Sequence, residues 1–139
     1  MSLDLSAAKT YRASFSVRAI QMTRREYNDL RGWIVPHQEN PKDKGFLVVR
    51  EDQPSNVDGI KGYVSWLPED VFNDTYKVTD TYVDRLIAEH DELEERLLKL
   101  KKALPDLKVP ESVREKLSRQ AVVMEEYLSI LKERMSFVD

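Results

Sequence analysis

The sequence contains no cysteine, which excludes disulfide bonds, zinc–thiolate sites, iron–sulfur clusters and cysteine nucleophiles. Its two histidines, His37 and His90, lie far apart and lack the short spacing of a histidine metal site. No uncharged apolar run approaches the roughly 18 residues that cross a bilayer, and residues 1–10 lack the apolar core of a signal peptide. The net charge of −3 disfavours a broad DNA-binding surface. We therefore expect no metal, no cofactor, and no binding to DNA or membrane.

Motifs of the common enzyme classes are also missing. There is no G-x-S-x-G, no phosphate-binding P-loop and no G-x-G-x-x-G. Acidic residues such as Glu92 and Glu125 fall at solvated helix positions, where surface pairing with lysine is the ordinary role. His90 occupies an apolar helix position typical of a core or interface residue, and His37 lies in a polar loop. The sequence predicts no catalytic residue, so the protein is not expected to be an enzyme.

The composition changes near residue 79. Residues 1–78 hold all four glycines and both tryptophans, whereas residues 80–139 hold no glycine and two prolines. Turn-forming residues in the first part and their absence in the second predict two domains. The expected fold class is α+β, with a small β-rich domain over 1–78 followed by an antiparallel helical hairpin over 79–139.

Alternating apolar residues and turn signals predict the elements of the first domain. Thr23 and Glu26 form a capping-box pattern that predicts a short helix, and Gly32 is expected to end it. Pro68 to Asp70 predicts a further turn or short helix. The expected strands are 15–22, 33–35, 45–49 and 60–67, with 71–78 as a possible edge strand.

Two helices are predicted in the second domain from apolar residues spaced three and four apart. Thr81 and Asp84 suit the start of the first helix, Pro105 its end, and Pro110 the first turn of the second. The short connection implies that the helices pack antiparallel. The stripe of the first helix is Val83, Leu86, His90, Leu93, Leu97, Leu100 and Leu104. The stripe of the second is Val113, Leu117, Ala121, Met124, Leu128, Leu131 and Met135.

The hairpin carries more apolar residues than one helix pair covers. Val123, Tyr127, Ile130 and Phe137 flank the second stripe, and Ile87 and Leu98 lie off the first. Exposed patches of this kind usually indicate association. We therefore expect the hairpin to assemble with copies of itself, with burial against the first domain as the alternative.

A set of aromatic and basic residues on the hairpin suits an anionic, base-containing ligand. A tyrosine near a helix start can stack on a nucleobase, and the forked donors of arginine suit phosphate. From the residues alone the ordinary interpretation is favoured, in which the tyrosine packs near the helix cap and the basic side chains form surface ion pairs. The candidate binding residues are Tyr82, Arg85, Arg96, Lys99 and Arg134.

The helical segments also carry two spaced motifs. Residues 82–93 read Y-x-x-R-L-x-x-E-x-x-E-L, and residues 120–134 read Q-x-x-x-M-x-x-Y-x-x-I-L-x-x-R. Over about residues 80–138 this pattern resembles a family of small helical phage proteins, the anti-CBASS cyclic-oligonucleotide sponges. The resemblance implies hairpins that assemble into a hexamer in the host cytoplasm and withhold messengers from immune effectors without cutting them.

The resemblance also implies roles for individual residues. Tyr82 would stack on a base of a cyclic dinucleotide such as 3′,3′-cGAMP, and Arg96 or Lys99 would meet its phosphate. Arg134 would contact the phosphates of a cyclic trinucleotide in a separate pocket. The competing hypothesis is a non-catalytic phage structural or interaction protein that uses the hairpin as a coiled-coil oligomerisation module.

The first domain resembles a second, small family of phage proteins. Tyr11-Arg12, Val17 and Ala19-Ile20-Gln21 echo its Y-R-K-x-P-V-x-x-x-A-x-Q-W-T opening, with Met22 in place of its tryptophan. Residues 60–63 and 68–76 echo its V-K-G-E-F-Y-P-C-K-P-D-I-F-E-K-T-Y ending, without the cysteine. This resemblance implies a phage origin and a small α+β domain, and it assigns no site.

Overall fold

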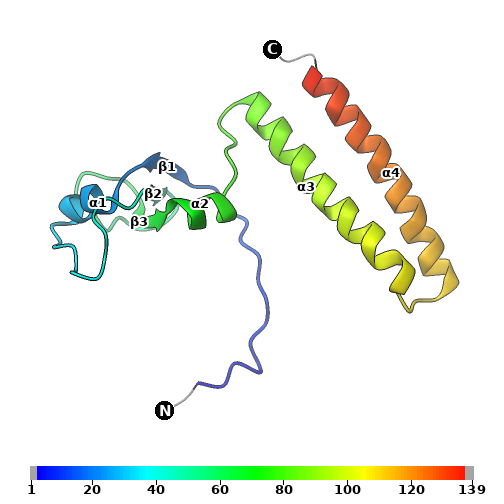
Figure 1. Ribbon diagram of the computed structural model, residues 1–139, viewed down its shortest axis with the longest axis horizontal. Helices are drawn as coiled ribbons and strands as arrows, with labels where there is room; N and C mark the ends of the chain where they lie inside the picture. The colour runs from blue at the N-terminus through cyan, green and yellow to red at the C-terminus, as the bar shows by residue number, and fades with distance from the viewer. Residues whose placement is uncertain (1–2, 137–139) are drawn as a thin grey trace. The chain divides into compact units, whose positions relative to one another are not determined.

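The structure, a computed structural model, describes residues 3–136 and divides the chain into two compact units. The first ends at Thr75 and the second begins at Tyr76. The first contains a three-stranded antiparallel sheet with two short helices, and the second contains two long helices (Figure 1). The fold class is therefore α+β, as predicted.

The sheet has the order β1-β2-β3, with β1 (Arg18–Gln21), β2 (Gly45–Arg50) and β3 (Tyr63–Pro68). All neighbours are antiparallel, and Ile20, Leu47 and Trp66 lie opposite one another across the three strands. Successive side chains of a strand point to opposite faces, so these three residues share one face. Strands predicted over 15–22, 45–49 and 60–67 are confirmed, the first and third being shorter than expected.

Helix α1 (Arg24–Arg31) begins and ends as its sequence predicts. The Thr23 side chain accepts a hydrogen bond from the Glu26 amide, and the Glu26 carboxylate accepts one from the Thr23 amide. Gly32 ends the helix in a left-handed conformation with φ of 73°, which glycine adopts without a steric penalty. The helix contributes Tyr27 to a small core with Leu47 and Val64.

Trp66 links β3 to the neighbouring elements. Its indole Nε1 donates a 2.7 Å hydrogen bond to the Met22 carbonyl, and the guanidinium of Arg24 lies 4.6 Å from its ring centroid. A Cβ on Gly45 would overlap the Trp66 ring and the Leu67 carbonyl oxygen. Glycine at this position therefore makes room for the indole against β2.

Two predicted strands of the first unit are wrong. Residues 33–35 form no strand, because the chain turns at Gly32 and the Trp33 amide donates back to the Asn28 carbonyl at 2.7 Å. Residues 71–78 form no edge strand either, since α2 (Glu69–Thr75) occupies most of them. Acidic residues in its first turn favour the helix, and Phe72 stacks on Phe46 of β2 with the ring centroids 4.0 Å apart.

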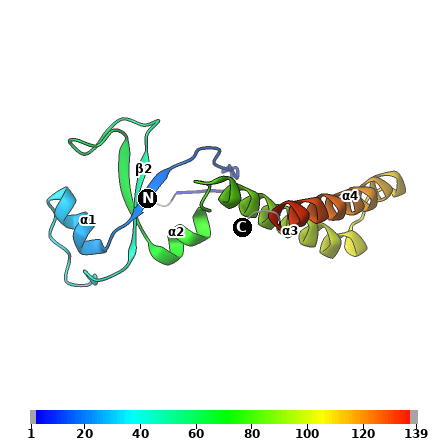
Figure 2. The same ribbon diagram turned by 90° about the horizontal axis from the view of Figure 1, so that it is seen from above.

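The second unit is an antiparallel helical hairpin of α3 (Tyr82–Ala103) and α4 (Glu111–Ser136), joined through the short 3₁₀ helix η1 (Leu104–Asp106). The two helices run side by side in both views (Figure 1, Figure 2). Predicted stripe residues form the core, and Leu131 is completely buried. The buried members of this core are Leu86, Leu93, Leu97, Ala121, Leu128 and Leu131. Phe137 lies outside the described residues.

Polar contacts fix both ends of the hairpin. Thr81 and Asp84 form a capping box at the start of α3, as predicted. At the connection, the Arg114 guanidinium donates to the carbonyl oxygens of Leu104 and Leu107. One side chain thus binds two backbone carbonyls of the segment that connects α3 to α4.

Candidate functional site

Tyr82 and Arg134 meet where the first turn of α3 faces the last turns of α4. Arg134 Nη2 donates a 2.7 Å hydrogen bond to the Tyr82 hydroxyl, and its Cζ lies 5.7 Å from the Tyr82 ring centroid. The Tyr82 ring remains half exposed. The structure therefore brings together a stacking surface and a cation, which are two of the predicted binding residues.

A second bond crosses the hairpin two helical turns further along. The Tyr127 hydroxyl of α4 donates to Glu89 Oε1 of α3. Glu89 is seven residues after Tyr82, and Tyr127 is seven residues before Arg134, so both crossings lie on the same side of the hairpin. We call this side, carrying Tyr82, Glu89, Tyr127 and Arg134, the tyrosine flank.

The same seven-residue spacing places a third pair of residues on the side of the hairpin that carries the tyrosine flank. Seven residues beyond Glu89 and seven before Tyr127 lie Arg96 and Gln120. Gln120 Nε2 contacts the sulfur of Met124 at 3.9 Å, and no hydrogen bond joins Gln120 to Arg96 in the described structure. Both side chains are exposed, so this level offers a guanidinium and an amide to solvent.

The neighbours of Arg134 on the tyrosine flank change its pKa. The hydrogen bond to the Tyr82 hydroxyl raises the pKa of Arg134 above its ordinary value, with a smaller contribution from the negative charge of Glu89. The guanidinium, positively charged as arginine ordinarily is, lies beside an aromatic ring. A charged fork of donors with an open side is suited to bind an oxyanion.

The tyrosine flank also carries exposed apolar side chains. Val123 and Ile130 lie four residues before and three residues after Tyr127, which places them on the same side of α4. They are 57% and 47% exposed in the single chain. The polar groups of the flank therefore stand beside an apolar strip of α4.

The other predicted site residues lie elsewhere or are engaged. Arg85 Nη1 donates to the carbonyl oxygens of Thr79 and Asp80 at 3.1 and 3.2 Å, so it holds the segment before α3. Lys99 pairs with Glu95 of its own helix at 3.1 Å. Arg96 lies 14 residues after Tyr82, about 21 Å along α3. One hairpin does not bring Arg96 and Lys99 to Tyr82.

Glu89 and Tyr127 were not among the predicted site residues. Glu89 reads as one more acid on a charged helix, and Tyr127 reads as part of the apolar flank of α4. They could have been found from their spacing, since Glu89 follows Tyr82 by seven residues and Tyr127 precedes Arg134 by seven. In an antiparallel helix pair, two residues that face each other are followed by another facing pair seven residues along each helix.

His90 is buried in the hairpin. Its Nδ1 lies 2.9 Å from Asp91 Oδ1, and its Nε2 has no hydrogen-bond partner in the described structure. Glu94 Oε2 is 3.9 Å from Nε2. No nucleophile accompanies the ring in these contacts, which agrees with a packing role.

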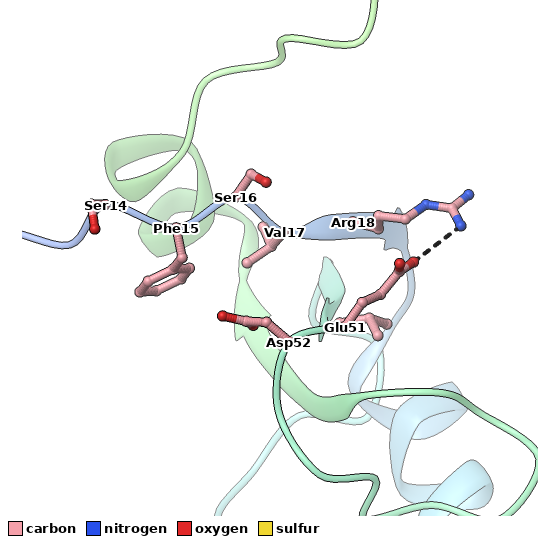
Figure 3. Close-up of a pocket in the computed structure, with 8 residues that line it drawn as sticks. Ser14, Phe15, Ser16, Val17, Arg18, Glu51 and Asp52 are labelled. Carbon is pink, nitrogen blue, oxygen red and sulfur yellow. Dashed lines mark hydrogen bonds and ion pairs between the residues drawn. The ribbon is translucent and has the colours of Figure 1, made fainter.

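A shallow cavity of about 390 Å³ lies beside β1 in the first unit (Figure 3). Arg18 reaches Glu51 at 3.3 Å, and Arg50 binds Asp52 while it covers the Phe15 ring at 3.7 Å. The hydrogen bond from Arg50 lowers the pKa of Asp52. These charges are engaged with one another, so the cavity presents no cluster prepared for catalysis.

Two features of metal and membrane proteins are missing from residues 3–136. No group of three or more histidine, aspartate or glutamate side chains in this range could hold a metal ion. None of the helices in this range is long and apolar enough to cross a membrane.

The hairpin is similar in sequence to one protein family. Residues 80–137 match the Sequestin family model. The matched Sequestin segment contains all of α3 and α4, and with them every residue of the tyrosine flank. No curated protein matches the chain, and no solved structure does.

Proposed function

We propose that this protein binds cyclic oligonucleotide second messengers and sequesters them without hydrolysis. The observation that carries the proposal is the bond between Tyr82 and Arg134, which sets a half-exposed aromatic ring beside a fixed cation. Stacking on an aromatic ring and pairing with guanidinium are the interactions that bases and phosphates use. The Sequestin match, whose name denotes sequestration, supports binding over catalysis.

The complete pocket forms between hairpins. Arg96 and Lys99 lie too far along α3 to join Tyr82 on a ligand held by one hairpin. The exposed Val123 and Ile130 favour a second hairpin covering the same flank. Docked copies place the basic residues of one hairpin opposite the tyrosine of another. The proposed assembly is a hexamer with separate pockets for cyclic dinucleotides and trinucleotides.

The biological role proposed is phage defence against CBASS immunity in the host cytoplasm. A sponge competes stoichiometrically with a sensitive immune receptor, so it needs tight binding. Nanomolar affinity corresponds to about −12 kcal/mol. A pocket that is already assembled reaches such affinity more readily, because binding then costs little conformational entropy of the protein.

The experiment combines thermal unfolding with ligand recovery. The full chain is heated with and without 3′,3′-cGAMP and cyclic tri-adenylate, then denatured, and the nucleotides are analysed by mass spectrometry. A sponge gains thermal stability by mass action and returns the messenger intact. A bare oligomerisation module shows no shift with either nucleotide. Recovery of linear products identifies an enzyme instead.

A further inference from the structure

Glu89 is an unexpected member of a flank proposed to bind anions. Its carboxylate accepts the hydrogen bond of the Tyr127 hydroxyl, and its negative charge contributes to raising the pKa of Arg134. A carboxylate repels phosphate. On the tyrosine flank it is suited to a ligand group that donates hydrogen bonds, and a nucleobase edge supplies such donors.

The Glu89 carboxylate is held by one hydrogen bond and can accept more. Tyr127 donates to Oε1, and Oε2 accepts no hydrogen bond from any described residue. An ionised carboxylate has about four acceptor positions, so Glu89 keeps capacity on both oxygens. The bond from Tyr127 holds the group at the surface of the flank instead of leaving it to rotate in solvent.

The spacing from Tyr82 matches the size of a stacked base. Glu89 lies seven residues along α3, about 10.5 Å, on the same side of the helix. A purine ring stacked on Tyr82 and a glutamate side chain together bridge this distance. The edge of the base, rather than its face, then meets the carboxylate.

From this arrangement we infer that Glu89 is a specificity residue that selects guanine-containing cyclic dinucleotides, an inference that rests on the proposed function. The Watson–Crick edge of guanine presents N1–H and the N2 amino group, two donors in line for the two carboxylate oxygens. Adenine presents one amino donor and the N1 lone pair, which the carboxylate repels. Tyr127 is the positioning residue that holds Glu89 for this contact.

The test is calorimetry on the full chain with cyclic di-GMP, cyclic di-IMP and cyclic di-AMP. Hypoxanthine keeps N1–H and lacks the N2 amino group, so it separates the two donors. The natural chain should bind cyclic di-GMP at least about tenfold more tightly than cyclic di-AMP, with cyclic di-IMP between them. Glu89→Gln should bring the three affinities close together, and Tyr127→Phe should reduce the preference in part.

Glu92→Gln is the matched control, because it removes the same charge from an exposed position of α3 and should leave the preference unchanged. A natural chain that binds the three ligands equally would overturn the inference while leaving the sponge intact. So would a Glu89→Gln variant that weakens all three by one factor, which indicates a structural role. A natural chain that binds none of them removes the proposed function itself for cyclic dinucleotides.

Discussion

Arg134 and Tyr82 are 52 positions apart in the sequence, yet Nη2 of the arginine donates to the tyrosine hydroxyl at 2.7 Å. The family resemblance gives these residues to two different pockets, whereas the hairpin couples them directly. A ligand that binds Arg134 therefore meets a guanidinium that already gives one Nη2 donor to the hydroxyl and keeps its other donors open. Each residue accordingly needs its own variant and its own ligand.

Tyr82→Ala should weaken binding of 3′,3′-cGAMP by about 5- to 150-fold, the loss of one base–aromatic stacking contact of about 1–3 kcal/mol. Tyr82→Phe keeps the ring and should retain most of the affinity. Isothermal calorimetry on the full chain measures both. Equal loss of dinucleotide and trinucleotide binding in Tyr82→Ala would indicate a broken assembly in place of a missing stacking surface.

Arg134→Ala should weaken capture of cyclic tri-adenylate, because charged hydrogen bonds of about 1.5–3 kcal/mol to phosphate are lost. The assembly should keep its native mass, since Arg134 is an exposed side chain at the end of α4. Calorimetry gives the affinity and native mass spectrometry the assembly. Unchanged trinucleotide binding would reject the assignment of Arg134 to phosphate.

Ile130→Lys should split the assembly into single chains, because it places a charge in the apolar strip of the tyrosine flank. Val122→Lys is the control, since Val122 is also exposed but lies five residues from Tyr127 and off the flank. Native mass and circular dichroism are measured together. If Ile130→Lys keeps the native mass of the natural chain, another surface holds the copies together.

Arg114→Gln should lower the free energy of unfolding of the hairpin by about 1.5–3 kcal/mol, because the carbonyls of Leu104 and Leu107 lose a charged donor. Arg119→Gln makes the same change at an exposed position of α4 and should have little effect. Urea unfolding followed by circular dichroism compares them. Equal midpoints for the two variants would show that the Arg114 bonds add no stability.

Asn56→Ala should destabilise the first unit by about 1–3 kcal/mol. The Asn56 amide accepts from the Val64 amide at 2.7 Å and donates to the Val64 carbonyl at 2.9 Å, so it replaces a neighbouring strand at a buried residue. Asn73→Ala, at an exposed position of α2, is the control. Tryptophan fluorescence during urea unfolding reports on this unit. No difference between the variants would contradict the role given to Asn56.

Local signals predicted the helices well and the strands less well. The capping boxes at Thr23 and Thr81 and the three–four spacing of apolar residues act within one or two helical turns, so the sequence alone locates them. Residues 33–35 are apolar enough for a strand, but Gly32 turns the chain before them. Pro68 to Asp70 correctly predicted a turn or short helix, but not its extension to Thr75, where Phe72 stacks on Phe46 in a contact that no local pattern contains.

Sequence patterns also located some of the candidate binding residues better than others. Tyr82 and Arg134 were predicted from residue type and motif, and the structure places them in contact. The bond between Glu89 and Tyr127 depends on the alignment of α3 against α4, which the sequence sets only through the combined packing of the whole core. Arg96 and Lys99 lie on the same helix as Tyr82, but too far along it to reach a ligand at Tyr82 within one hairpin. Sequence patterns alone do not show which hairpins would share a ligand.

At one position of the first unit, Gly45, the absence of a side chain makes room for Trp66. At Gly45 a single extra carbon atom would displace the Trp66 indole, and with it the bond to Met22 and the stacking of Arg24. Those contacts reach the end of β1, helix α1 and strand β3 at once. The packing of the Trp66 indole against β2 therefore depends on glycine at position 45.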